Sequence, residues 1–330
     1  MDKEHRQGLV AIFFANTFFG LNIPVTKSLM AGWMTPMGYT ATRMLFGAIV
    51  FWGIGAFLKQ EKVRGKDLFV MLLGGLIGYI GTQFLFSQSL EYTSPVIFAL
   101  LMALTPVVVL LISALFLKEA IPFRKVIGIG MSVSGAALII LLGANKGTTG
   151  ANNLLGIIFA LLCVLAYSVY LVLTRKISIK YQPVTIAKWM FLISAVVAMP
   201  FGISGFQSQK IYTPETTGLA ISLLLFALLF SSILAFFLMP YGLKRLEAST
   251  VSIFMNWQPI VASVVAIIVG QDMLTWDKPL AVILVLTGVY LVTRQKTSTK
   301  NKGTGKRKIQ FNPGKVNAKD SETKLVDKNT

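Results

Sequence analysis

Long, uninterrupted apolar segments recur along nearly the whole of this 330-residue chain. Hydrophobic residues make up 55% of the sequence and charged residues only 13%, about half the charged share of a soluble domain. A single packed core cannot take up that much apolar surface, so most of it must face lipid. We therefore expect an integral membrane protein.

Ten of the apolar segments are long enough to predict helices that cross a membrane. A crossing helix needs about 20 mostly apolar residues, whereas strands of a membrane β-barrel alternate over segments of about 10 residues. These segments are continuous, so we expect an all-α polytopic membrane protein. The ten predicted spans cover residues 8–26, 37–58, 68–90, 95–117, 126–143, 154–174, 184–204, 218–243, 250–270 and 279–293.

Loops that are rich in lysine and arginine alternate along the chain with loops that have few of them. With the N-terminal residues 1–7 inside the cell, the inner loops carry 12 Lys/Arg, and the outer loops carry only Lys146, Lys210 and Lys278. Basic residues concentrate in cytoplasmic loops. The pattern therefore predicts cytoplasmic N- and C-termini, and we expect the protein in the inner (plasma) membrane of a bacterial cell.

Of the net charge of +18, +8 lies in the polar segment 294–330, which carries 11 Lys/Arg against 3 Asp/Glu. This segment has too few apolar residues to form a core and is predicted to be a disordered basic cytoplasmic tail. It either only fixes topology or is also attracted to anionic lipid, at about 1 kcal/mol per basic residue near the surface. Because the charge lies at a membrane surface, it does not predict binding to nucleic acid.

Reactive side chains are scarce. The single cysteine, Cys163, has no disulfide partner, and the single histidine, His5, lies outside the spans. This excludes the usual histidine-built metal and acid–base sites, so no metal, cofactor or enzymatic activity is expected. Acidic residues fall at the ends of the predicted spans and not near the middle of the membrane: Glu91, Glu119, Glu247 and Asp272.

The second half of the chain repeats features of the first in the same order. At an offset of 153 residues the sequence matches Met102 with Met255, Pro106 with Pro259, Lys125 with Lys278, Gly135 with Gly288, and Glu119 with Asp272. Each predicted repeat (residues 8–143 and 154–293) holds five spans. Since five is odd, the second copy enters the membrane from the opposite side. This predicts two inverted repeats, an architecture common among alternating-access carriers.

Several of these segments carry a resemblance to a known family. They are residues 20–27, 90–94, Pro106, 117–119, Gly128 and Gly135, then 167–170, 243–247, Pro259 and Gly288. Over residues 8–293 the chain resembles the drug/metabolite transporter superfamily, in its ten-helix group with two EamA-type repeats. It departs at Gln258, where the family often has an acidic residue, and at Asp272, where glutamate is commoner. The resemblance implies transport of amino acids or related small metabolites, frequently outward.

Arg43 lies deep in the second span, about 10 Å below its outer end at the usual helical rise. It is either a structural cation bonded to helix-end carbonyls or a residue of an outer gate or of a substrate carboxylate site. Small multidrug exporters of the same superfamily bind cations on a buried glutamate. The first span here offers Asn16 and Asn22 instead, which disfavours exchange of a lipophilic cation for protons.

The candidate substrate site follows from polar and aromatic side chains that share helix faces, such as Tyr79 and Gln83, four residues apart. Each of these groups could equally hold helices together. Predicted hydrogen-bonding residues are Asn16, Tyr79, Gln83, Tyr167, Tyr170 and Asn256, with Arg43 for a carboxylate. The predicted apolar wall is Phe98, Met102 and Trp257, and the predicted kinks or gates are Pro24, Pro106 and Pro259.

These features favour a secondary transporter that exports a small neutral or zwitterionic metabolite, such as an amino acid, by alternating access. A sugar-phosphate transporter would need at least two buried cations, and only Arg43 qualifies. A drug transporter of the same fold and an uncoupled facilitator remain alternatives, and a membrane-embedded enzyme is the least favoured. The expected partners are the substrate and lipid, and the chain is a monomer or a homodimer.

Overall fold

The computed structural model describes residues 3–117, 123–145, 153–206, 209–246, 250–251, 254–272 and 276–293. Within these ranges every regular element is a helix. Six helices are long and apolar enough to cross a membrane: Lys3–Met30, Gly65–Tyr92, Pro95–Ile112, Asn153–Lys180, Pro183–Phe201 and Gly218–Arg245. The chain is therefore an all-helical polytopic membrane protein, as the sequence predicts. The predicted basic tail, Glu119 and Glu247 lie outside the described residues.

The first half of the chain forms helices whose starts follow ordinary capping rules. Thr35 and Ser94 accept hydrogen bonds from backbone amides three residues on, and a proline follows each of them at the first helical position. The elements are α1 (Lys3–Met30), α2 (Pro36–Ala56), α3 (Gly65–Gly74), η1 (Gly75–Gly81), α4 (Thr82–Tyr92), α5 (Pro95–Met102), α6 (Thr105–Leu117) and α7 (Phe123–Asn145).

The second half follows the same style of construction. Thr217 caps its helix by accepting a hydrogen bond from the amide of Ala220. The elements are α8 (Asn153–Lys180), α9 (Pro183–Phe206), η2 (Lys210–Tyr212), α10 (Gly218–Phe226), η3 (Ala227–Leu234), α11 (Ala235–Arg245), α13 (Trp257–Ile268) and α14 (Asp277–Thr293).

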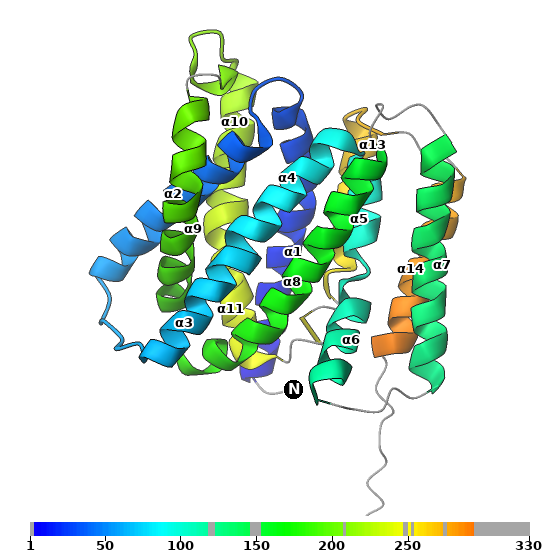
Figure 1. The fold of residues 1–330 in the computed structure, drawn as a ribbon, viewed down its shortest axis with the longest axis horizontal. Helices are drawn as coiled ribbons and strands as arrows, with labels where there is room; N and C mark the ends of the chain where they lie inside the picture. The colour runs from blue at the N-terminus through cyan, green and yellow to red at the C-terminus, as the bar shows by residue number, and fades with distance from the viewer. Residues whose placement is uncertain are drawn as a thin grey trace, which may run out of the picture. The chain divides into compact units, whose positions relative to one another are not determined.

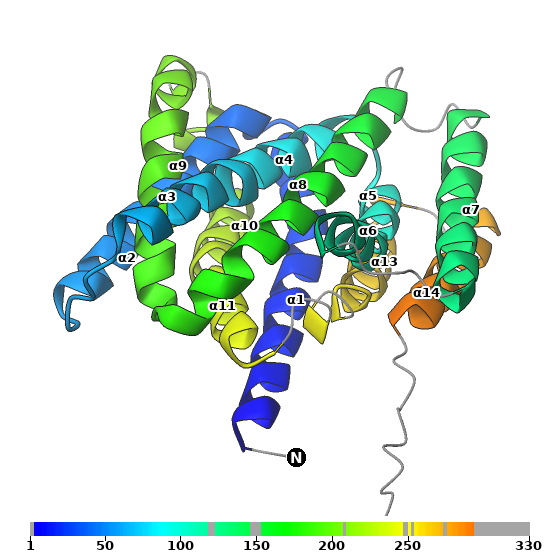
Figure 2. The same cartoon turned by 60° about the horizontal axis from the view of Figure 1, so that its bottom comes forward.

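Helices from the two halves pack against each other in pairs (Figure 1). α2 packs against α9, α7 against α14, α1 against α11 and α13, and α8 against α4, α5 and α6. A turned view shows the α7–α14 pair and the α2–α9 pair on opposite sides of α1 and α8 (Figure 2). Large apolar side chains such as Phe69, Leu115 and Val196 are more than half exposed, which suits helices whose outer faces contact lipid.

Two of the long helices change to a π-helix near their middle. η1 joins α3 to α4, and η3 joins α10 to α11, and in both cases no non-helical residue lies between them. A π-helix has i→i+5 hydrogen bonds and is usually short and associated with function. Its wider turn changes the direction in which the following side chains point. The residues after Gly81 and the serines of η3 therefore leave the phase of a simple α-helix.

The predicted spans 95–117 and 250–270 are interrupted rather than continuous. A turn at Ala103 and Leu104 separates α5 from α6, and a turn at Met255 and Asn256 precedes α13. Pro106 and Pro259 lie in the first turn of the helix that follows each interruption, where the missing amide hydrogen costs no helical bond. The kinks predicted at these prolines are thus helix starts. At Pro24, in contrast, α1 continues as one helix.

Candidate functional site

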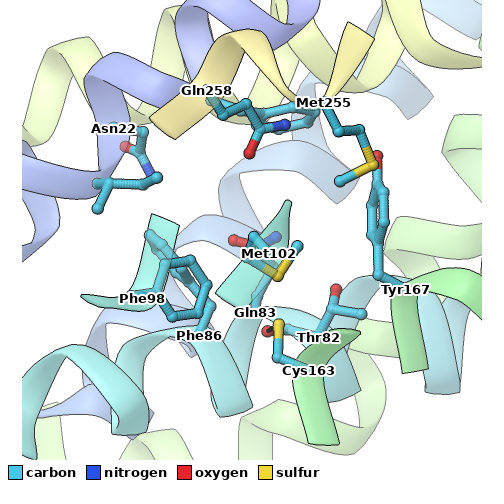
Figure 3. A pocket seen from close by; sticks show the side chains of 12 residues that line it. Asn22, Thr82, Gln83, Phe86, Phe98, Met102, Cys163, Tyr167, Met255 and Gln258 are labelled. Carbon is cyan, nitrogen blue, oxygen red and sulfur yellow. Dashed lines mark hydrogen bonds between the residues drawn. The ribbon is translucent and has the colours of Figure 1, made fainter. Parts of the chain in front are cut away.

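A pocket lies where α1, α4, α5 and α8 meet the segment that leads into α13 (Figure 3). It is small, with room for a few ordered waters. We call this the central pocket. Twelve residues line it: Phe19, Asn22, Ile23, Thr82, Gln83, Phe86, Phe98, Met102, Cys163, Tyr167, Met255 and Gln258.

The lining of the central pocket is mixed, with aromatic and thioether groups beside hydrogen-bonding ones. Phe86 and Phe98 form a T-shaped pair with ring centroids 5.1 Å apart. The hydroxyl of Tyr167 is buried and has no hydrogen-bond partner among the described residues. Buried polar groups are nearly always bonded, so an unpartnered hydroxyl on a pocket wall indicates a place where a bound molecule can bond.

Gln258 reaches the central pocket from α13 and is held from behind by the predicted site residue Asn16. The Gln258 amide nitrogen donates to the Asn16 side-chain oxygen at 2.7 Å, and the Asn16 amide donates to the carbonyl of Ile12 at 2.8 Å. Figure 3 shows Gln258 on the same side of the pocket as Asn22 and Met255. Asn16 therefore contacts the pocket through Gln258 and does not line it.

Arg43, on α2, has no exposed surface and lies directly behind Gln83. Its Nε donates to the hydroxyl of Ser232 at 2.7 Å, its Nη2 donates to the hydroxyl of Ser231 at 2.8 Å, and its Nη1 donates to the Gln83 side-chain oxygen. The guanidinium carbon also lies 5.2 Å from the centre of the Tyr39 ring. The helix-end carbonyls expected as structural partners of Arg43 are thus replaced by side chains from η3 and α4.

A second polar chain links the central pocket to Arg43 from the side of α1. Asn22, which lines the pocket, accepts a hydrogen bond from the Tyr39 hydroxyl at 3.2 Å. Tyr39 also bonds to the hydroxyl of Thr26 at 2.9 Å, and all three side chains are buried. Because the Tyr39 ring faces Arg43, both Asn22 and Gln83 connect the pocket to the same cation.

Tyr79 and Tyr170 lie beside the central pocket in a cluster of aromatic rings. The centroid of the Tyr79 ring lies 4.4 Å from that of Phe236, 4.7 Å from that of Phe191 and 5.8 Å from that of Tyr170. Tyr170 in turn lies 5.5 Å from Tyr167, which lines the pocket. These two predicted site residues therefore pack the wall behind the pocket, while Gln83, Phe98, Met102 and Tyr167 of the same prediction line it.

Asn256 and Trp257 lie away from the central pocket, in a separate apolar groove with Phe13, Ile260 and Tyr290. The Trp257 indole donates to the Thr17 hydroxyl at 3.0 Å. The physical reason is the turn at residues 255–256, which ends the helical phase that would have aligned Asn256 with Pro259. After this turn the buried face of α13 carries Gln258, Pro259, Ala262 and Ala266 instead.

Other residues of the central pocket had a signal in the sequence. Cys163 lies four residues before Tyr167, Thr82 and Phe86 flank Gln83 on α4, and Phe19, Asn22 and Ile23 follow Asn16 at helical spacing. Extending the predicted stripes by one turn would have found Phe19, Phe86 and Cys163. Met255 and Gln258 lacked such a signal because they lie on the two sides of an interruption.

None of the described residues that line the central pocket is acidic. Among the described residues, the buried charged side chains are Arg43 and Lys188, and no Asp or Glu is buried. The same part of the chain holds no group of three or more potential metal ligands. The pocket is thus built for hydrogen bonding and aromatic contact next to one positive charge.

The sequence profile of the EamA-like transporter family matches residues 6–141 and again residues 154–294. The chain belongs to the EamA-like transporter family. Its similarity to individual transporters extends over most of each chain. An uncharacterized transporter of Bacillus subtilis, YyaM, is 26% identical over 289 residues, which cover 87% of this chain and 93% of that protein.

A probable terminal-alkyne amino-acid exporter of Streptantibioticus cattleyicolor is also similar, at 23% identity over 285 residues that cover 84% of this chain and 88% of that exporter. One solved crystal structure matches this EamA-like chain with a TM-score of 0.60 and 21% identity, covering 88% of this chain and 98% of the other. At this level of identity the match shows a shared fold.

Proposed function

We propose that the chain is a secondary transporter that exports a small neutral or zwitterionic metabolite, most plausibly an amino acid, by alternating access. The central pocket is the proposed substrate site. The observation that carries this proposal is the unpartnered Tyr167 hydroxyl in a buried, aromatic pocket whose polar wall is connected to Arg43. The similarity to a probable amino-acid exporter supports the choice of substrate class.

The proposed architecture is ten spans in two inverted repeats of five. The spans are α1, α2, α3–η1–α4, α5–α6, α7, α8, α9, α10–η3–α11, the segment that ends in α13, and α14. Three observations support the repeat: the family profile matches twice, the third helix of each half contains a π-helix, and the fourth is interrupted before a proline. Helix pairing agrees, because α1 packs on α11 and α13 as α8 packs on α4 and α5–α6.

Alternating access requires the central pocket to widen. In this structure the pocket has room for a few ordered waters, so a substrate as large as a bulky amino acid requires its walls to move apart. The interruptions at residues 103–104 and 255–256 border the pocket through Met102 and Met255. Interrupted helices commonly form the substrate site of such carriers, around which one repeat moves against the other, so we place these two turns at the substrate site.

A sugar phosphate fits this site poorly. Phosphate groups are normally bound by two or more cations, and none of the residues that line the central pocket is a lysine or arginine. Arg43 is the nearest buried cation, behind Gln83, and it could serve a single carboxylate better than a phosphate.

Transport by purified protein in proteoliposomes tests the proposal. The vesicles are loaded with a labelled mixture of amino acids, and efflux is measured with and without an imposed proton gradient. Selective efflux of one or a few amino acids, absent from empty vesicles, is the expected result. Acceleration by the gradient would indicate proton coupling, and efflux that never exceeds equilibration would indicate a facilitator. No efflux of any amino acid would contradict the proposed substrate class.

The proposed setting is the bacterial inner membrane with both chain ends in the cytoplasm, and it rests on the distribution of basic residues among the loops. Cysteine labelling of intact cells measures it directly. In a Cys163→Ala background, a cysteine at Lys210, which lies in the outer loop of this topology, is expected to react with a membrane-impermeant maleimide. A cysteine at Lys62, in an inner loop, is expected to react only after lysis.

A further inference from the structure

Arg43 is a charged group at membrane depth whose hydrogen-bond partners are all neutral. It is fully buried, and its three bonds go to two serine hydroxyls and one amide oxygen. Buried cations in membrane proteins usually pair with an acidic side chain, because an uncompensated charge is costly in a medium of low dielectric constant. Of the described residues, none that is buried is acidic. Among the described residues, therefore, no buried acidic side chain supplies a counter-charge to Arg43.

Gln83 separates this cation from the central pocket. Its side chain lines the pocket and is 9% exposed, and its oxygen accepts a hydrogen bond from Nη1 of Arg43. A carboxylate binds a guanidinium more strongly than an amide does, because the acceptor is itself charged. The amide of Gln83 thus occupies the place on the pocket side of Arg43 where a carboxylate would bind best.

The other contacts of Arg43 allow such an exchange. Ser231 and Ser232 hold Nη2 and Nε from η3, on the far side from Gln83, so the guanidinium keeps two bonds when the third partner changes. The rest of the pocket wall offers Phe86, Phe98, Met102 and Met255, which suit an apolar body attached to the carboxylate.

We propose that Gln83 is a placeholder: when substrate enters the central pocket, the Gln83 amide leaves Arg43 and the carboxylate of the substrate takes its place. This inference rests on the proposed function and narrows it. The transported compound must carry a carboxylate on an apolar body, and Arg43 recognises that carboxylate only after Gln83 has moved.

The exchange is tested without any substrate by placing a carboxylate at residue 83. In the Gln83→Glu variant an internal ion pair with Arg43 forms, so the protein in lipid nanodiscs is expected to unfold at a higher temperature than the wild type. The increase is expected to vanish in an Arg43→Gln background, since the effects of two contacting residues are coupled. Gln88→Glu, a partly buried position of the same helix that does not line the pocket, is the matched control and should give no increase. An equal or lower unfolding temperature for Gln83→Glu than for the wild type would overturn the placeholder role.

Transport supplies the second test, with the labelled amino-acid mixture as substrate and an equimolar mixture of the corresponding amino-acid amides as competitor. The amides lack the carboxylate, so they are expected to compete about tenfold more weakly than unlabelled amino acids, a difference of about 1.4 kcal/mol. Gln83→Glu is expected to lose transport while it remains folded, because its own carboxylate fills the site.

The outcomes separate the two proposals. Wild-type efflux of amino acids together with equal competition by the amides overturns the carboxylate inference and leaves the amino-acid carrier intact. No efflux of any amino acid overturns the proposed substrate class, and the unfolding comparison then decides the placeholder role by itself. Normal transport by Gln83→Glu contradicts the exchange in either case.

Discussion

The two π-helices differ in the side chains they carry, although both interrupt the third helix of a proposed repeat. η1 contains Gly75, Gly78 and Gly81, and the ring of Tyr170 from α8 packs directly onto Gly78. η3 contains no glycine and presents Ser231 and Ser232 to Arg43. The same departure from α-helical geometry thus brings two helices close together in one half and surrounds a buried charge with hydroxyls in the other.

The interrupted helices differ in a similar way. The turn after α5 leaves Phe98 and Met102 on the pocket wall, so the first half contributes apolar groups there. The turn before α13 brings Met255 and Gln258 to the pocket, so the second half adds an amide. The two proposed repeats therefore contribute differently to the pocket: shared backbone irregularities supply the shape, and local side chains supply the polarity.

Removing Arg43, the charge on α2 that the serines of η3 contact, is expected to have the largest effect. Arg43→Ala leaves Gln83, Ser231 and Ser232 without their common partner and opens a void, which should lower the free energy of unfolding by about 3 kcal/mol and abolish transport. Unfolding in nanodiscs and proteoliposome efflux measure the two effects. Arg43→Lys, the conservative control, keeps the charge but cannot contact all three side chains with a planar fork. An alanine variant as stable as the wild type would show that the hydroxyls of η3 do not depend on Arg43.

Filling the close contact at the first π-helix should give the next largest effect. Gly78→Leu places a side chain where the Tyr170 ring lies, and such overpacking costs about 1–3 kcal/mol. The same unfolding measurement applies. Gly53→Leu on α2 is the matched control, because a side chain at that exposed glycine meets no other atoms. If both variants were equally stable, close packing at η1 would not be the role of its glycines.

Removing single hydroxyls from η3 should have a smaller effect. Ser231→Ala or Ser232→Ala each deletes one hydrogen bond to Arg43 and is expected to lower the free energy of unfolding by about 1.5 kcal/mol. In an Arg43→Ala background the loss should disappear for Ser231→Ala and shrink for Ser232→Ala, whose hydroxyl also donates to the carbonyl of Ala227 at 2.9 Å; a double-mutant cycle measures both. Ser222→Ala, an exposed serine on α10, should change nothing. Losses that persist without Arg43 would assign the serines to helix packing.

The smallest expected effect separates two neighbouring residues at the second interruption. Gln258→Ala removes an amide from the central pocket and should slow transport about fivefold, the equivalent of one hydrogen bond of about 1 kcal/mol. Asn256→Ala changes a residue only two positions away, in the separate apolar groove, and this variant should transport at the wild-type rate. Initial efflux rates at matched protein density measure both. The reverse ranking would place Asn256, and not Gln258, at the substrate.

Much of the helix layout could be predicted from the sequence, because apolar length is a local property. Helix spacing also brought Gln83 and Tyr167 to the pocket correctly, since α4 and α8 are regular where these residues lie. Asn256 lies outside the central pocket for the opposite reason: the turn at residues 255–256 resets the helical phase, and no residue pattern before Pro259 reveals that the helix stops there.

The partners of Arg43 could not be predicted from its surroundings in the sequence. The depth of this arginine was evident, but its contacts come from Gln83, 40 residues away, and from Ser231 and Ser232, 188 and 189 residues away. Serines are common in membrane helices as packing residues, so nothing distinguished these two. Only the fold, together with the wider turn of η3, brings them to the cation.

The distant contacts of Arg43 have a consequence for the synthesis of this protein. α2 is not among the helices that are apolar enough to cross a membrane by their own composition. More than half of the chain lies between the end of α2 and the start of η3, so the ribosome makes η3 long after α2. During that interval the arginine must be shielded by water, lipid headgroups or the insertion machinery. The second segment of the chain is therefore expected to settle at its final depth late, and the order in which the helices emerge need not be the order in which they become stably embedded.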